Sequence, residues 1–430
     1  MSGRLAIGGG EPVRRAGFPE QNTLGPEERA AVLEVLDSGV LSGFVGEWTD
    51  DFNGGPRVRA CEQAFAERLN AHDAVAVNSA TTGLQTALAA VGVGPGDEVI
   101  VPPFTMSATA ATVLLQDAVP VFADIEDETY GLDPESVAAL VTERTRAIVV
   151  VHLFGHPARM DGLLEIAERH ELAIVEDAAQ SIGATWRGRE TGTLGTAGVL
   201  SLNFHKIIHS GEGGIVLPSS SEAAMHARLV RNHGEVVAED AGAPLPNAIG
   251  SNFRMTEIEA AIAFEQLKKL DGLLATRREL AARLTRRLAA LPGIVPATVA
   301  GECTHSFYVY PVRVLPDELG VPREALARAL EAEGIPVGQG YVKPIYLQAA
   351  YQQRIARGER GAPWRGGHWQ GEVSYEKGIC PVVERLHEEE LLLLDVTRSL
   401  LGERDVDDVA EAFEKVVEHR DELRAVELTR

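Results

Sequence analysis

Lys206 is the residue of this sequence best placed for covalent chemistry. It follows a short apolar run and precedes a glycine cluster at residues 211–214. A lysine amine can form a Schiff base with a carbonyl compound. The glycines let the backbone turn sharply and pass close to a ligand. Because most lysines are solvated surface charges, this pattern needs support from the rest of the chain.

A carboxylate and an amide supply that support. Asp177 follows an apolar segment at residues 173–176, and Gln180 lies three positions further on. An aspartate placed there can pair with the protonated pyridine nitrogen of pyridoxal phosphate and make the ring a better electron sink. Gln180 would share the helical face of Asp177 and could reach the substituents of the ring. The structural alternative is that Asp177 caps a helix.

Small and hydroxyl-bearing residues follow an earlier apolar segment at residues 74–77. Ser79, Ala80 and Thr81 come directly before a helical pattern. A turn of this kind binds phosphate through backbone amides, hydroxyl groups and the helix dipole. Helix capping alone would also explain the hydroxyl residues.

Three further residues are candidates for cofactor contacts. Ser201, five positions before Lys206, could add a hydroxyl group to the phosphate site. Phe104 comes just after the segment 98–101 and could stack on a flat ring, although a core phenylalanine is the ordinary alternative. Asn252 is a polar residue beside a turn, and by composition alone it is a loop residue.

The elements that must position these residues alternate between short apolar runs and helical patterns. The predicted strands are residues 74–77, 98–101, 119–123, 147–151, 173–176, 199–202 and 215–217. Near-continuous apolar strands separated by helices predict an α/β fold with a mostly parallel sheet sandwiched by helices. Ligands of such sheets bind beyond the carboxyl ends of the strands. The candidate residues should therefore gather at that edge.

We expect three parts in the chain. Residues 1–25 are rich in glycine and proline and predict an irregular N-terminal arm. Residues 26–274 would form a large cofactor-binding domain, and residues 275–430 a smaller α+β domain. The glycine-rich segment 354–378 is either a surface loop or a substrate lid.

The pattern of the C-terminal third predicts four elements. They are a long helix over 257–291, a strand over 305–315, a helix over 323–333 and an amphipathic terminal helix over 404–426.

Composition excludes several classes of function. The net charge of -23 argues against nucleic acid or an anionic membrane as a general partner. Three cysteines without a CxxC motif predict no disulfide framework and no zinc site, and no histidines stand at metal-ligand spacing. No apolar run reaches membrane-spanning length. We therefore expect a soluble, cytoplasmic protein without a metal.

Taken together, these motifs resemble the DegT/StrS-type sugar aminotransferases, which are fold-type I pyridoxal-phosphate enzymes. The resemblance extends from about residue 24 to residue 418. Its most specific segments are 94–102, 176–180, Lys206 with 211–214, and 252–255. Several ordered motifs at matching spacing are far more specific than any one of them.

The resemblance implies a role for each candidate. Lys206 would be the Schiff-base lysine and proton carrier, Asp177 the pyridinium partner, and Gln180 a neighbour of the ring oxygen. The phosphate binders would be Ala80, Thr81 and Ser201, beside Ser79, and the stacking aromatic would be Phe104. Asn252 matches a residue that reaches the phosphate of the neighbouring subunit, which implies a homodimer with two shared sites.

The substrate is narrowed by two C-terminal segments. Residues 340–346 and 380–386 resemble the branch of the family that acts on cyclitol ketones. Residues 201–206 differ from that branch, so nucleotide-linked keto-sugars are a second class of candidate substrate. Tyr341, Lys343 and His305 are candidate substrate contacts, although packing or solvent exposure explains each of them equally well.

The predicted reaction moves an amino group from glutamine or glutamate to a ketone on a sugar or cyclitol ring, as in aminosugar and antibiotic biosynthesis. One alternative is a dehydratase or other eliminating enzyme with the same cofactor. Some relatives of that kind replace the lysine by histidine, but here Lys206 occupies the matching position and His205 is its neighbour. The other alternative is a non-catalytic regulator of the same fold.

Overall fold

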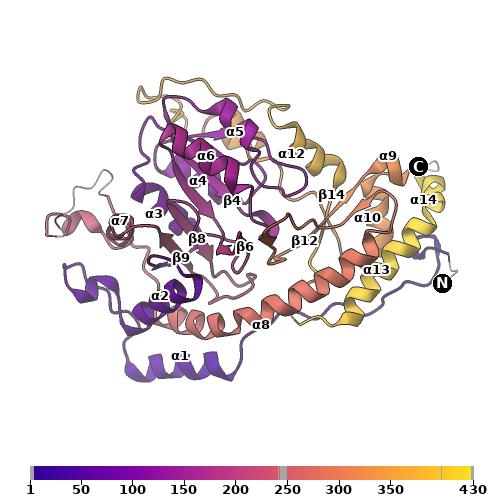
Figure 1. Ribbon diagram of the computed structural model, residues 1–430, viewed down its shortest axis with the longest axis horizontal. Coiled ribbons are helices and arrows are strands. Elements are labelled where there is room, and N and C mark those ends of the chain that lie inside the picture. The colour runs from indigo at the N-terminus through magenta and orange to yellow at the C-terminus, as the bar shows by residue number, and fades with distance from the viewer. Residues whose placement is uncertain (1–3, 241, 243–248, 399, 428–430) are drawn as a thin grey trace.

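A seven-stranded sheet forms the centre of the molecule in the computed structural model, which describes residues 4–240, 242, 249–398 and 400–427 (Figure 1). The strand order is β1-β9-β8-β5-β4-β2-β3. The strands are β1 (Val75–Val77), β2 (Glu98–Val101), β3 (Val119–Phe122), β4 (Thr145–Val151), β5 (Ala173–Asp177), β8 (Ala197–Ser201) and β9 (Gly214–Pro218). Strand β9 is antiparallel to β1 and β8, and the other pairs are parallel. The predicted mostly parallel sheet is confirmed.

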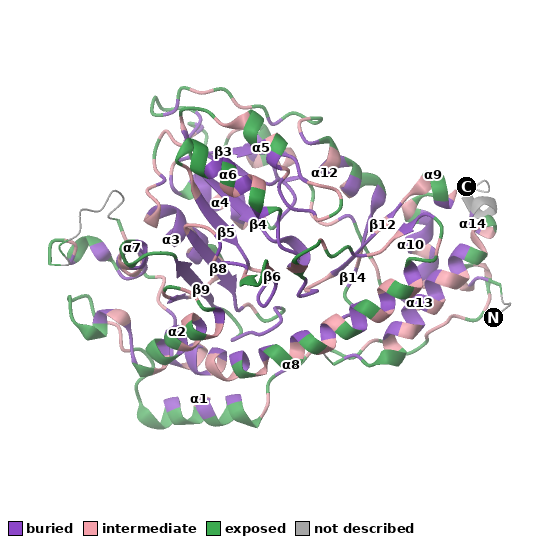
Figure 2. Cartoon of the chain, in the orientation of Figure 1, coloured by how far each residue is buried: buried purple, intermediate pink, exposed green. Residues whose placement is uncertain are grey.

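Helices cover both faces of this sheet, because successive strand residues point to opposite sides. Val75 and Val77 face α3 and α4, whereas Ala74 and Ala76 face α2 and α8. Further along the second face, Ile148 and Val150 pack on α5 and α6. The bounds are α2 (Pro56–Leu69), α3 (Ala80–Ala90), α4 (Ala108–Leu115), α5 (Pro134–Leu140), α6 (Met160–His170) and α8 (Glu257–Leu288). Figure 2 shows the resulting buried strands at the centre.

A second, antiparallel sheet lies at the far end of α8 (Figure 1). Its order is β10 (Ile294–Val295), β12 (Tyr310–Val314), β14 (Leu391–Leu394) and β13 (Gly338–Gln339). Helices α9 (Pro316–Leu319), α10 (Arg323–Ala332), α13 (Glu403–Glu418) and α14 (Arg420–Glu427) belong to this end. The predicted smaller α+β part is confirmed, and its sheet is antiparallel. The predicted division at residue 274 stays a prediction and falls inside α8.

The remaining elements are short or peripheral. They are α1 (Pro26–Ser38), α7 (Ser221–Arg231), α11 (Ala349–Gln352), α12 (Pro381–Arg385), a small sheet of β11 (Cys303–Thr304), β6 (Thr185–Trp186) and β7 (Arg189–Glu190), 3-10 turns at Ala6–Gly8, Asp50–Asn53, Leu153–Gly155, Gly234–Val236 and Ile345–Leu347, and a π turn at Leu386–Glu390. Among the described residues, no helix is both long and apolar enough to cross a bilayer.

Two predicted elements differ from the structure. The strand predicted over 305–315 begins only at Tyr310, because Phe307 adopts a left-handed backbone conformation with φ of 49°. The terminal helix predicted over 404–426 is two helices, since α13 ends at Glu418 and α14 begins at Arg420.

The glycine-rich segment 354–378 packs on the large sheet. The side chains of Trp364 and Tyr375 are buried in the same core as Phe122 of β3. Trp364 Nε1 donates to Tyr375 Oη at 2.9 Å, and Tyr375 Oη donates to the carbonyl of Pro120 at 2.8 Å. Trp364 of this segment therefore belongs to the core of the large sheet.

The N-terminal arm binds to the end of the molecule that carries the second sheet. The buried carboxylate of Glu333 accepts hydrogen bonds from the amides of Ala6 (2.9 Å) and Val13 (3.0 Å) and pairs with Lys415 at 2.8 Å. The arm then returns to α8, where Thr23 Oγ1 donates to Gln266 at 2.7 Å. Residues 15–22 therefore lie between two fixed points.

Candidate active site

A cavity of about 170 Å³ lies beyond the carboxyl ends of the central strands, where an α/β sheet binds its ligands. Its wall comes from the segments that follow β1, β2, β5 and β8. The residues that line it are Ser79, Ala80, Thr81, Leu84, Thr105, Met106, Ala108, Val151, Asp177, Ala179, Gln180, Ser201, Asn203, His205, Lys206 and Glu212. The structure thus brings Lys206, Asp177, Gln180, Ser201 and the turn 79–81 together.

Asp177 is held in a fixed orientation at the end of β5. Its Oδ2 accepts a hydrogen bond from Thr109 Oγ1 at 2.8 Å, and its Oδ1 accepts one from the Ala179 amide at 3.2 Å. Burial raises the pKa of Asp177, and the Thr109 hydroxyl and the Lys206 amine act in the opposite direction. Thr109 lies on α4, and no sequence motif pointed to it.

Lys206 lies at the other side of the cavity with only 9% of its surface exposed. Burial lowers the pKa of its amine to about 8, against the opposing effect of Asp177. Its Nζ lies 4.4 Å from the centroid of the Tyr308 ring. Its backbone carbonyl accepts a hydrogen bond from Gln21 Nε2 at 3.3 Å. A buried amine with a lowered pKa is a better nucleophile at neutral pH.

The turn at residues 79–81 opens α3. Ser79 caps the helix, since its Oγ accepts from the Thr82 amide at 3.1 Å. The amides of the first helical turn have no partner within the helix and can bind an anion. Gly214 of β9 is needed beside this turn, because a Cβ there would lie 2.8 Å from the amide nitrogen of Ala80.

Gln180 joins the cavity to its surroundings through both ends of its amide. Its Oε1 accepts from the Phe154 amide at 2.9 Å, and its Nε2 donates to Tyr341 Oη at 3.0 Å. The Tyr341 ring packs edge-on against Phe104 and Phe154 at centroid distances of 5.7 and 5.2 Å. Tyr341 therefore contacts Gln180 but does not line the cavity.

A buried network fixes the strand that carries Asp177. Glu176 accepts a hydrogen bond from His152 Nε2 at 2.8 Å, and both side chains are fully buried. His152 Nδ1 accepts from the Ala158 amide at 3.0 Å, so its hydrogen is on Nε2. The His152 amide donates to the Asp177 carbonyl at 3.2 Å. The network fixes the backbone of Asp177 through its carbonyl group.

Five predicted site residues do not line the cavity, and Tyr341 is one of them. Phe104 is 1% exposed and belongs to the core, whereas Met106, two positions on, lines the cavity and is 57% exposed. His305 is buried and stacks on a phenylalanine ring. Lys343 and Asn252 are exposed on the surface of the chain. The roles assigned to all five stay predictions.

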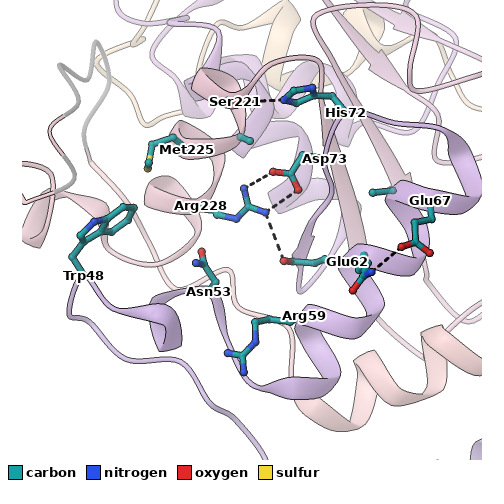
Figure 3. Close-up of a pocket in the computed structure, with 13 residues that line it drawn as sticks. Trp48, Asn53, Arg59, Glu62, Glu67, His72, Asp73, Ser221, Met225 and Arg228 are labelled. Atoms are coloured by element: carbon teal, nitrogen blue, oxygen red, sulfur yellow. Dashed lines mark hydrogen bonds and ion pairs between the residues drawn. The ribbon is translucent and has the colours of Figure 1, made fainter.

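A larger cavity of about 610 Å³ lies between α2 and α7 and shares no lining residue with the first. Figure 3 shows Arg228 between the carboxylates of Asp73 and Glu62, at 2.7 and 3.9 Å. His72 contacts Ser221 at 3.1 Å. These polar groups pair with one another, and none of them is a nucleophile of the kind that Lys206 provides.

Three comparisons relate the chain to known proteins. The model of the DegT/DnrJ/EryC1/StrS aminotransferase family matches residues 23–364. A Streptomyces fradiae protein described as L-glutamine:2-deoxy-scyllo-inosose aminotransferase is 39% identical, with 98% of this chain and 100% of that protein covered. A GDP-perosamine synthase of Caulobacter vibrioides is 39% identical over 75% of this chain and 84% of that protein.

The fold agrees with these relatives. The solved structure of an aminotransferase from Psychrobacter cryohalolentis matches with a TM-score of 0.80 and 29% identity, and covers 94% of this chain and 99% of that one. The predicted resemblance is confirmed by sequence and by structure. The chain belongs to the DegT/DnrJ/EryC1/StrS aminotransferase family.

Proposed function

We propose that this protein uses pyridoxal phosphate to move an amino group from L-glutamine to the ketone of a free cyclitol related to 2-deoxy-scyllo-inosose. The observation that carries the proposal is the cavity itself. It combines a buried lysine amine, a buried carboxylate and the first turn of a helix in one space.

The residues of the cavity fit that cofactor by their chemistry. The first turn of α3, with Thr81 and the Ser201 hydroxyl, would hold a phosphate group. Asp177, oriented by Thr109, would pair with a protonated ring nitrogen, and Gln180 would lie beside the ring oxygen. Bound pyridoxal phosphate supplies an electron-withdrawing ring that makes a hydrogen on the amino-bearing carbon acidic.

The chain's own residues then perform the proton chemistry. With a pKa of about 8, the Lys206 amine can both accept and release a proton near neutral pH. The buried His152–Glu176 pair holds Asp177 in place while this happens. The presence of lysine at position 206 supports transamination over the dehydratase alternative and argues against a non-catalytic regulator.

The charge of the cavity supports a free cyclitol over a nucleotide-linked sugar. Among the described residues that line it, Asp177 and Glu212 are acidic, and Lys206 is the only lysine or arginine. A diphosphate group binds best to several cationic donors. The relative that acts on 2-deoxy-scyllo-inosose also covers more of this chain than the GDP-perosamine synthase does.

A homodimer with shared sites is part of the proposal. Met106 at the cavity and Phe204 beside Lys206 are 57% and 67% exposed, and Leu33 and Leu36 of α1 are 47% and 50% exposed. Exposed apolar side chains of this size are typical of surfaces that a partner covers. In such a dimer, Asn252 would reach the phosphate group in the partner's cavity.

The test is a product assay with purified protein, pyridoxal phosphate, L-glutamine and 2-deoxy-scyllo-inosose, read by mass spectrometry. The expected result is an aminated cyclitol that Lys206→Ala does not form. Amination of a nucleotide-linked keto-sugar alone would overturn the proposal that the acceptor is a free cyclitol. Loss of water from the ring without amination would instead establish the dehydratase.

A further inference from the structure

Tyr308 contacts the amine on which the proposed chemistry depends. It lies in the connection between β11 and β12, far from Lys206 in sequence. The Lys206 Nζ stands over its ring, 4.4 Å from the centroid. That distance is within the range in which an ammonium group is attracted to the face of an aromatic ring.

The backbone on both sides of Tyr308 is fixed. The carbonyl of Phe307 accepts hydrogen bonds from Arg277 Nη1 at 2.9 Å and from Thr397 Oγ1 at 3.2 Å. The amide of Val309 donates to the carbonyl of Phe154 at 3.4 Å. The position of the ring is thus set by α8, by the end of the second sheet and by the turn after β4.

The same contacts reach the backbone of Lys206. Arg277 Nη2 donates to Gln21 Oε1 at 3.2 Å, and Gln21 Nε2 donates to the Lys206 carbonyl at 3.3 Å. Gln21 belongs to the N-terminal arm, which is bound at both of its ends. Arg277 and Gln21 therefore link the backbone beside Tyr308 to the backbone of Lys206. This link sets the distance between the two residues.

We propose that Tyr308 is a positioning residue whose ring holds the Lys206 amine whenever that amine is not bonded to the cofactor. The inference rests on the proposed function, because an aminotransferase releases its lysine in the first half-reaction and recovers it in the second. A long lysine side chain that is free in the cavity would adopt several rotamers. The ring keeps the amine close to the position from which it accepts and returns a proton.

The charged and titratable groups around the pair are few. Asp177 faces Lys206 from β5, and His205 is its neighbour in the chain. Tyr341, Arg277 of α8 and Arg398 after β14 act on the Tyr308 side. Since the ring favours the protonated amine, its loss should reduce the proton affinity of Lys206 about threefold to tenfold.

The test compares Tyr308→Phe, which keeps a ring, with Tyr308→Leu and Tyr308→Met, which do not. The first readout needs no activity: the pH dependence of Lys206 modification by a small amine-reactive ester in the cofactor-free protein, followed by peptide mass spectrometry. The second is the single-turnover rate with L-glutamine in the protein loaded with pyridoxal phosphate.

We expect Lys206 to titrate at lower pH in the ring-free variants. Their single turnover should be about tenfold slower, with little change in the glutamine concentration that gives half of the maximal single-turnover rate. Tyr308→Phe should stay within about twofold of the parent in both readouts. The proposal is overturned if a ring-free variant matches the parent, or if Tyr308→Phe loses as much as Tyr308→Leu. Failure of the proposed function would look different, because the parent protein itself would then show no turnover with glutamine.

Discussion

Replacing Thr109 by valine removes one hydrogen bond from the carboxylate of Asp177, together with a contact between the Thr109 and Thr105 hydroxyls at 3.3 Å. Threonine and valine side chains have the same shape, and Thr109 is fully buried. Its hydroxyl donates to Asp177 Oδ2 at 2.8 Å. A hydrogen bond to a charged group contributes about 1.5 to 3 kcal/mol. Because that hydroxyl stabilises the charged carboxylate, its loss should raise the pKa of Asp177 in the variant.

The sign of the effect on cofactor binding follows from this shift. Burial already raises the pKa of Asp177, and the Thr109 hydroxyl opposes that effect. A protonated Asp177 cannot pair with a charged ring nitrogen, so the variant should lose affinity as pH falls, beginning at a higher pH than the parent. At neutral pH we expect pyridoxal phosphate to bind about tenfold more weakly.

The assay is an absorbance titration of the cofactor-free protein with pyridoxal phosphate at several pH values. Thr112→Val is the matched control, because Thr112 is also buried in α4 but donates to the backbone carbonyls of Ala108 and Thr109. Equal affinities and equal pH profiles for the parent and Thr109→Val would refute the reasoning. An equal loss of affinity for pyridoxal phosphate in Thr112→Val would also refute it.

Three further predictions concern stability and assembly. Burial raises the pKa of Glu28, but its hydrogen bonds outweigh that effect and lower the pKa to about 2. The stability that this carboxylate contributes is therefore present above pH 4.5 and should fall as the pH drops toward 2. Urea midpoints at a series of pH values will test this. Arg231→Leu removes the closest charged partner of the buried Glu62 carboxylate, which lies 2.6 Å away, and leaves it Arg228 at 3.9 Å. The variant should lose about 3 kcal/mol in the free energy of unfolding, and no change in the urea midpoint would contradict the pairing. If the sites are shared, mixing inactive Asn252→Ala with inactive Lys206→Ala should restore part of the activity by forming hybrid dimers; no recovery after exchange of subunits would count against a shared phosphate site.

The sheet could be predicted from sequence because its strands are buried on both faces. Each appears as a continuous apolar run bounded by helical patterns, which is a local signal. Lys206, Asp177 and Ser79 were found for the same reason, since each follows a predicted strand and such ends converge at one edge of a parallel sheet.

Contacts between distant segments could not be predicted in this way. Tyr308 and Gln21 reach Lys206 only because α8 and the N-terminal arm bring three separate segments together. Phe104 shows a different limit. The sequence placed an aromatic residue just after β2, but the backbone turns its side chain into the core, and Met106 faces the cavity instead.

The visible absorption spectrum of the purified protein with pyridoxal phosphate, before and after L-glutamine, tests the central claim most directly. We expect a yellow protein whose visible band requires Lys206 and disappears when glutamine is added. A protein that stays colourless with the cofactor, or a Lys206→Ala variant with the same band and the same response, would contradict it.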